Sequence, residues 1–437
     1  MKRLSDALVL QRQGSRLLHR VPNRFIVAFF LFALAGCASV EETTPESAET
    51  YLDRAQTQAE GPIRVTASVP SAKETRELFG APLYQKNVQP VWLEVQNQGP
   101  TNVNFLPVGL DPLYYTPMGA AYLSEEGKQG GSNRAVKARR FYSESMGRVT
   151  VPPGETRAGF VFTSLDEGTK TFNVDLISEQ KKAYLFTFFI PVPGLRIDHH
   201  NVDWEHLYAE DEWLEFNEAA SLIETLESFP CCTTDKKGRD QGDPLNLVII
   251  GEIDDIYYAF LRAGWDETET SYAGSLKKTI GSFFSGGEYR YSPVSGLYVF
   301  ERPQDVAFQK TRDNIHERNH LRLWLSTARY RGVPVFIGQI SRDIGVRFSK
   351  RTITTHEVDP DVDETREFLL ENLAYSQSLA AIAYVGGVGE APIEAPRRNL
   401  TGSPYFTDGY RVVLWATATP TSIADINVLE WRDPAID

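Results

Sequence analysis

The chain has 437 residues, and its 45 basic and 58 acidic side chains give a net charge of −13. An acidic surface of this kind repels nucleic acids and anionic lipids, so both are excluded as main partners. Hydrophobic residues make up 42% of the chain. This length and composition predict two or three domains, each able to form its own core.

A basic and apolar segment opens the chain. Six Lys or Arg residues lie within residues 1–24, the apolar run Phe25–Leu34 follows, and Leu34-Ala35-Gly36-Cys37 closes the segment. This order is typical of a secretory signal. The alternative is a membrane-spanning helix, but ten apolar residues form only about 15 Å of helix, half of the hydrocarbon core of a bilayer.

The last four residues of this segment, Leu34–Cys37, resemble the bacterial lipobox. The resemblance implies removal of residues 1–36, a lipid on the Cys37 sulfur and attachment to a membrane through that lipid. Without residues 1–36, 39 basic and 57 acidic residues remain, a net charge of −18. Ala38, where Asp would signal retention, implies the outer rather than the inner membrane of a Gram-negative cell envelope.

Two further cysteines, Cys231 and Cys232, are adjacent. Neighbouring Cα atoms lie about 3.8 Å apart, below the usual range for disulfides, so a bond between the two sulfurs is strained. We expect two thiols without a redox function, with a vicinal disulfide as the alternative.

The first part of the mature chain divides into a tether and a β-rich domain. Residues 37–61 are polar and predict a flexible lipidated tether. Residues 62–194 predict an all-β sandwich with immunoglobulin-like features, because short β-prone runs alternate with turn clusters. The expected strands are 63–69, 91–96, 104–107, 159–162, 171–176 and 183–190.

The second part predicts a mixed α+β domain over residues 204–418, followed by a C-terminal tail, 419–437. Strands and helices occur there without regular βαβ alternation. The expected helices are 204–229, 254–263 and 364–384, with Gly386–Gly389 ending the last helix. The expected strands are 245–250, 297–301, 319–327, 334–340, 345–348 and 411–416.

Several sequence blocks between Leu207 and Ala416 resemble the LssY C-terminal domain family. The blocks are Asp243–Val248, Ser292–Ser295, Arg302–Lys310, His316–Trp324, Arg342–Gly345, Thr355-His356 and Asp359–Asp363. In related chains this domain follows membrane-embedded modules of the DedA and lipid-phosphatase kinds. The resemblance therefore implies work at an envelope membrane and assigns no reaction.

Residues His316-Glu317-Arg318-Asn319-His320 match H-E-x-x-H, which binds zinc when it lies on a helix. A strand is favoured here, because leucines at 321, 323 and 325 alternate with Arg322, Trp324 and Ser326. On a strand, His316, Arg318, His320, Arg322 and Trp324 share one face, and the leucines share the other.

The candidate catalytic residues are His316, His320, Arg322, Asp343, His356 and Asp361. The three histidines are also the candidate ligands of a divalent metal such as zinc. Arg318 and Arg322 suit an anionic substrate such as phosphate. Two alternatives stay open: an Arg/Asp/His network that only stabilises the sheet, and a role for the acids at 359–363 in capping the following helix.

Two classes of function follow. The first is a metal-assisted hydrolase that acts on an anionic envelope substrate, and it depends on the His/Asp/Arg residues. The second is a non-enzymatic lipoprotein that binds or scaffolds an envelope protein through its sandwich.

Overall fold

The computed structural model describes residues 50–124, 138–147, 149–195, 197, 202–268, 296–311, 318–347, 355–432 and 434, with backbone alone at 346–347 and 355–356. All of these residues fall within the unit Thr50–Asp437. The signal segment, Cys37 and His316 lie outside the described residues. Among the described helices, none has the length and apolar character needed to cross a bilayer.

The N-terminal part consists of two four-stranded antiparallel sheets that share one core. The first sheet contains, in order, β1 (Gln56–Glu60), β2 (Ile63–Ser68), β3 (Val88–Asn97) and β6 (Thr156–Ser164). The second contains β5 (Thr150–Val151), β4 (Val103–Leu106), β7 (Thr169–Ser178) and β8 (Ala183–Pro191). Alternate residues such as Val91, Leu93 and Val95 face this core. All six expected strands are therefore confirmed.

The expectation of an all-β segment is wrong in one respect, because it also contains helices. Helix α2 (Ala72–Phe79) begins with a capping box in which Ser71 and Glu74 bond each other's backbone N–H groups. Helix α3 (Pro117–Leu123) begins after Thr116, whose hydroxyl accepts from Gly119 N. Short 3-10 turns are η1 (Tyr51–Arg54), η2 (Leu83–Lys86) and η3 (Pro107–Gly109). Residues 51–60, expected in the tether, instead form η1 and β1.

The C-terminal part is built on a mixed ten-stranded sheet. Its main order is β13 (Asp266–Glu267), β16 (Val306–Thr311), β17 (Arg318–Tyr330), β18 (Val333–Arg347), β12 (Leu247–Ile250), β23 (Arg411–Ala416), β20 (Leu379–Val385) and β24 (Asn427–Val428), while β19 (Thr355–Val358) pairs with β18 and β9 (Leu214–Phe216) with β17. Strand β12 runs parallel to β23 and antiparallel to β18. The α+β class is confirmed.

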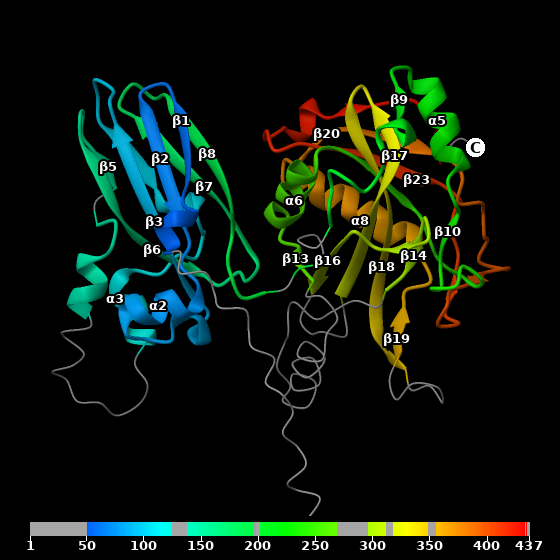
Figure 1. Ribbon diagram of the computed structural model, residues 1–437, viewed down its shortest axis with the longest axis horizontal. Helices are drawn as coiled ribbons and strands as arrows, with labels where there is room; N and C mark the ends of the chain where they lie inside the picture. The colour runs from blue at the N-terminus through cyan, green and yellow to red at the C-terminus, as the bar shows by residue number, and fades with distance from the viewer. Residues whose placement is uncertain are drawn as a thin grey trace, which may run out of the picture. The chain divides into compact units, whose positions relative to one another are not determined.

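Helices and a small sheet cover the two faces of this sheet. Helices α6 (Ile253–Arg262) and α8 (Val362–Tyr375) pack on one face (Figure 1). Helix α5 (Ala219–Ser228) packs on the other face, beside a small sheet of β11 (Gln241–Pro244), β10 (Cys232–Thr234), β14 (Tyr298–Val299) and β15 (Arg302–Pro303). The remaining elements are η5 (Glu210–Glu212), β21 (Arg397–Arg398), β22 (Pro404–Tyr405) and η6 (Ile423–Asp425).

Two expected helices are wrong. Residues 204–229 form turns, η5, β9 and only then α5. Their apolar residues belong to two clusters. Leu207 and Trp213 pack against the core cluster that includes residues of α6 and α8, whereas Leu226 packs on the opposite face of the sheet. The expected helix 364–384 stops at Tyr375, because Gln377 adopts a left-handed φ of 62°. Residues 379–385 form β20, so the glycines at 386–389 follow a strand.

The structure contains the vicinal disulfide, and the expectation of two thiols is wrong. Cys231 and Cys232 are bonded to each other, with their Cα atoms 3.7 Å apart. Cys232 is buried next to the Tyr405 hydroxyl.

Candidate functional site

A row of three buried polar side chains follows one face of β17. Arg318, His320 and Arg322 are each at most 6% exposed. Trp324 continues this row toward the small sheet, whereas Leu321, Leu323 and Leu325 pack with α6 and α8. The strand interpretation of this motif is therefore confirmed from Arg318 onward, and the predicted division into a polar and a leucine face is correct.

The hairpin between β17 and β18 brings His320 to Asp343, as the predicted pairing of these strands requires. His320 Nε2 lies 2.5 Å from Asp343 Oδ2, and Arg318 Nε lies 3.7 Å from the same oxygen. Burial lowers the pKa of His320 to about 4, although the neighbouring Asp343 acts in the opposite direction. The imidazole is thus neutral at pH 7, and its Nε2–H donates to the carboxylate.

Arg322 belongs to a deeper buried set. Its guanidinium donates to Gln339 Oε1 at 2.7 Å. Burial lowers its pKa to about 10, and the charge that most opposes this shift is Asp243 on β11. Burial raises the pKa of Asp243, whose Oδ1 accepts from Asn399 at 2.8 Å. Arg322 therefore lies in a buried polar set near Asp243 of the small sheet and does not line the pocket described next.

A pocket of about 360 Å³ opens where β16, β17 and β18 meet the N-terminal half of α8. Three cations and one carboxylate line it, together with two neutral polar and two apolar side chains. They are Lys310, Arg318, Arg342, Asp343, Thr311, Asn319, Ile344 and Phe368. The charged lining carries a net positive charge, in a chain that is acidic overall.

Lys310 has neutral oxygens as its hydrogen-bond partners. Its Nζ donates to Ala263 O at 2.5 Å and to Asn372 Oδ1 at 3.0 Å. Ala263 lies directly after α6, and Asn372 lies on α8, so both helices hold the ammonium. In the described part of the chain, no carboxylate comes within 4.0 Å of Nζ. Burial lowers the pKa of Lys310, and the nearby carboxylate of Asp266 acts in the opposite direction.

Arg342 lies beside Lys310 on the same face, because Asn319 pairs with both residues across the strands. Arg342 Nε donates to Asn319 Oδ1 at 3.2 Å, and its guanidinium lies 5.4 Å from the centre of the Phe368 ring. Glu364 at 3.2 Å and Asp359 at 4.0 Å partly neutralise its charge. Arg318 enters the pocket from the other face, where Gln309 Oε1 accepts from it at 2.7 Å.

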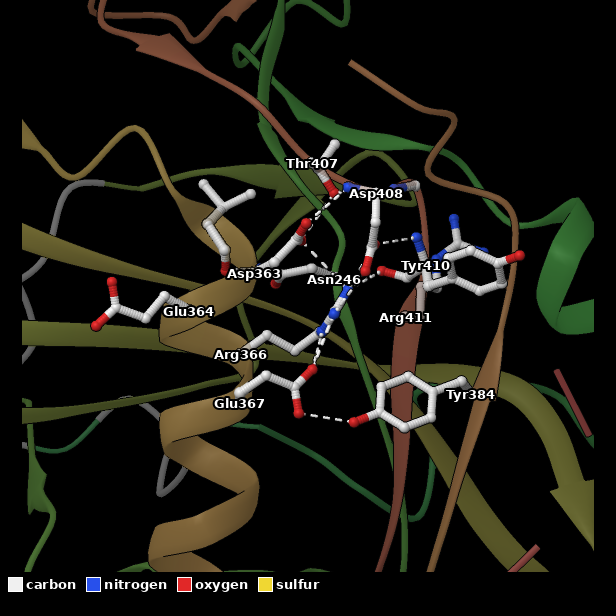
Figure 2. Close-up of polar contacts among 12 residues, drawn as sticks. Asn246, Asp363, Glu364, Arg366, Glu367, Tyr384, Thr407, Asp408, Tyr410 and Arg411 are labelled. Carbon is white, nitrogen blue, oxygen red and sulfur yellow. Dashed lines mark hydrogen bonds and ion pairs between the residues drawn. The ribbon is translucent and has the colours of Figure 1, made fainter. Parts of the chain in front are cut away.

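Asp361 does not line this pocket. Its Oδ1 accepts from Glu364 N at 3.0 Å and caps α8, as the capping alternative predicts. Asp363 accepts from Thr407 Oγ1 and Asp408 N. Figure 2 shows buried Arg366 between Asp363, Glu367 and Asp408, an arrangement that fastens α8 to the loop before β23.

The other two candidate histidines are placed only in part. His316 lies outside the described residues, as does the side chain of His356. The His356 backbone pairs with Val346, three residues beyond Asp343 along β18. Within the described residues, no group of three or more His, Cys, Asp or Glu side chains is arranged to hold a metal ion.

Sequence reasoning missed six of the pocket residues, namely Lys310, Thr311, Asn319, Arg342, Ile344 and Phe368. Lys310 and Asn319 are direct cross-strand neighbours. The alternation of Val306, Phe308 and Lys310 toward the helices carries a signal for this position, because a lysine replaces the third apolar residue of a buried face. Phe368 comes from α8 and cannot be placed by local periodicity.

These observations describe a mixed α+β domain with a cationic pocket at one end of its sheet. Residues 223–410 match the family model described as LssY C-terminus, a range that contains every residue lining the pocket. This match confirms, for residues 223–410, the resemblance of the sequence blocks to the LssY C-terminal domain family. The comparison with curated proteins gives no match.

Proposed function

We propose that this chain is a lipid-anchored protein of the Gram-negative cell envelope whose LssY C-terminal domain binds an anionic group of the phosphate kind. The observation that carries the proposal is Lys310, a half-buried cation that lines the pocket and has only neutral oxygens as hydrogen-bond acceptors in the described structure.

A partly buried cation is costly when its counter-charge is not in direct contact, as with Lys310 and Asp266, and a bound oxyanion supplies a nearer one. Arg318 and Arg342 approach the same pocket from the two faces of the hairpin. Guanidinium groups present paired N–H donors that match phosphate oxygens. Ile344 and Phe368 add an apolar wall, so the preferred ligand combines an anion with an apolar portion.

The test is calorimetric titration of the full chain with inorganic phosphate and with phenyl phosphate. We expect saturable binding, tighter for phenyl phosphate, which weakens as salt is added. Lys310→Gln is expected to weaken binding about tenfold or more, because one charge-assisted hydrogen bond contributes roughly 1.5–3 kcal/mol.

The matched control is Lys182→Gln, which replaces an exposed lysine paired with Glu60 in the N-terminal part. Binding by this variant should equal that of the wild-type chain. Equal binding by wild type and Lys310→Gln would contradict the proposal.

A second candidate is hydrolysis at the same pocket, favoured by the contact between Asp343 and His320. His320 holds the Asp343 carboxylate at the pocket wall, and a carboxylate in this position can accept a proton from an attacking water. Release of phenol from phenyl phosphate tests this candidate. Asp343→Asn should abolish turnover, whereas Asp361→Asn, on the helix cap, should not.

A divalent metal such as zinc is part of this second candidate. Asp343 and His320 would supply donors, with His316 and His356 as the further ligands that the sequence suggests. A metal of this kind would activate the attacking water. Elemental analysis of the purified chain tests this part: a stoichiometric metal lost in a His320→Ala variant supports it, and metal-free protein with full turnover contradicts it.

The remaining alternative is a protein that binds or scaffolds an envelope partner without catalysis. The two sheets around one core support an immunoglobulin-like description of the N-terminal part, and such domains commonly bind other proteins. Phosphate binding without any turnover would favour this alternative over the hydrolase.

A further inference from the structure

Exposed apolar side chains gather on one stretch of the N-terminal part. Of the 18 large hydrophobic residues that are exposed in the described structure, six lie within residues 108–123. They are Val108, Leu113, Tyr114, Met118, Tyr122 and Leu123, here called the α3 patch. Leu113 is 78% exposed and Tyr122 is 68% exposed. Such a concentration of apolar residues marks a contact surface more often than isolated exposed residues do.

Helix α3 has apolar residues on both sides. Ala120 and Ala121 are buried against Phe141 and Phe162 in the core cluster at this end of the sandwich. Met118 and Tyr122 lie one turn apart, on the side that faces away from this cluster. The outer side of a helix that faces water usually carries polar residues. The apolar residues on the outer side of α3 therefore indicate that this side contacts an apolar environment.

The chain enters the structure close to this patch. The ring of Tyr51, in the first described turn, lies 5.8 Å from that of Phe160. Phe160 belongs to the same core cluster as Ala120 and Ala121 of α3. Thirteen residues, 38–50, separate this turn from Cys37, and a chain of that length spans at most about 47 Å. A lipid on Cys37 therefore keeps the α3 patch within reach of the membrane surface.

The sequence that follows α3 and the net charge of the chain both bear on what contacts the patch. Residues 125–137 follow α3 directly, but all of them except Ala135 and Val136 are charged, polar or glycine. The mature net charge of −18 disfavours attraction to an anionic surface, so contact with the membrane depends on apolar area.

We propose that the α3 patch inserts shallowly into the lipid surface to which the chain is anchored, with Leu113, Tyr114 and Met118 among the acyl chains and head groups. The proposal rests on the lipid anchor of the proposed function. Tyrosine suits this depth, because its ring is apolar and its hydroxyl stays hydrated. A shallow contact of this kind adds to a lipid anchor without crossing the bilayer.

The test uses the full lipidated chain in phosphatidylcholine vesicles. A Met118→Cys variant supplies a free thiol, since Cys37 is acylated and Cys231 is bonded to Cys232. An environment-sensitive fluorophore on this thiol should shift to shorter wavelength when vesicles are added and should be quenched by quenchers attached to the lipid. The matched control is Tyr375→Cys, which labels a residue that is 83% exposed on the C-terminal part and should show neither effect.

Flotation of the chain with the vesicles reports the lipid anchor separately from the patch. A chain that floats while the Met118 label behaves like the Tyr375 label overturns the patch proposal and leaves the anchor intact. A chain that does not float overturns the anchor. A Met118 label that is shielded before vesicles are added and escapes the lipid quencher also overturns the proposal, and a concentration-dependent dimer would then identify a second copy as the cover.

Discussion

His320 on β17 and Asp343 on β18 are held together inside the protein, with Nε2 2.5 Å from Oδ2. The two residues are nearly opposite across the hairpin, since His320 pairs with Ser341. Because burial lowers the pKa of His320 to about 4, the folded protein keeps this imidazole neutral under conditions where the unfolded chain, with a pKa near 6.5, takes up a proton.

This difference predicts the pH dependence of stability. The unfolded chain binds more protons than the folded chain between about pH 6.5 and pH 4, so the free energy of unfolding falls as the pH is lowered through this range. Between pH 7 and pH 5, the free energy of unfolding should fall by about 2 kcal/mol less in His320→Gln than in the wild-type chain. Urea unfolding of both chains at the two pH values measures it.

The control is His206→Gln. His206 is exposed, and the neighbouring Asp203 raises its pKa, so any stabilisation it gives is present at low pH and lost as the pH rises. This variant should keep the wild-type loss of stability on acidification. An unchanged loss in His320→Gln would refute the assignment of this effect to His320.

Replacing Asp361, the N-cap residue of α8, distinguishes a structural role of this side chain from a catalytic one. Asp361→Ala removes an acceptor for Glu364 N and should lower the free energy of unfolding by about 1 kcal/mol. Anion binding should not change, because Asp361 does not line the pocket. Asp211→Ala, in an exposed 3-10 turn without a side-chain cap, should cost less. A loss of anion binding by folded Asp361→Ala would show that Asp361 acts at the pocket.

Substitution of Arg411 should be among the most destabilising changes in the domain. It is 0% exposed and donates to the backbone carbonyls of Leu226, Phe229, Pro230, Leu245, Gly386 and Gly387. Arg411→Met leaves these buried acceptors without their donor and should lower the free energy of unfolding by about 3 kcal/mol or more.

Chemical denaturation measures the effect of Arg411→Met, and Arg398→Met is its control. Arg398 is exposed and donates to one carbonyl, that of Gly402, at 2.7 Å. Its replacement should change the free energy of unfolding by less than about 1 kcal/mol. A cost for Arg411→Met as small as that for Arg398→Met would contradict the role given to Arg411.

Cys37→Ser tests the lipidation and membrane attachment that the sequence predicts. The variant should lose the palmitate label and appear in the fraction not bound to membranes, because the sulfur that carries the lipid is gone. Cys232→Ser, which breaks the disulfide with Cys231, should keep the label. Labelling of Cys37→Ser at the wild-type level would disprove the lipobox interpretation.

Local pattern predicted much of the polar row and little of the pocket. Alternation along β17 placed Arg318, His320 and Arg322 on one face, because side-chain direction in a strand depends only on sequence parity. A short connection between two strands predicted the hairpin that brings Asp343 to His320. Lys310 could not be assigned in this way, because its partners, Ala263 after α6 and Asn372 on α8, are distant from it in sequence.

The errors have similar causes. Apolar residues at helical spacing in 204–229 serve opposite faces of the sheet, a division that the sequence alone does not reveal. The stretch after Tyr375 is apolar enough for a helix, but a single left-handed residue, Gln377, redirects it into the sheet. Arg411 draws its acceptors from three separate segments, so no local pattern marks it.

The position of β12 has a consequence for how the domain is made. Its four residues, Leu247–Ile250, are at most 1% exposed and lie between β18 and β23. β23 begins at Arg411, about 160 residues after the end of β12. During synthesis, the apolar strand β12 is therefore complete long before its parallel neighbour β23 has been made. Pairing at such separations is slow, and an unpaired apolar edge recruits other chains. Chains that terminate before Arg411 should therefore accumulate as aggregates rather than as smaller folded domains.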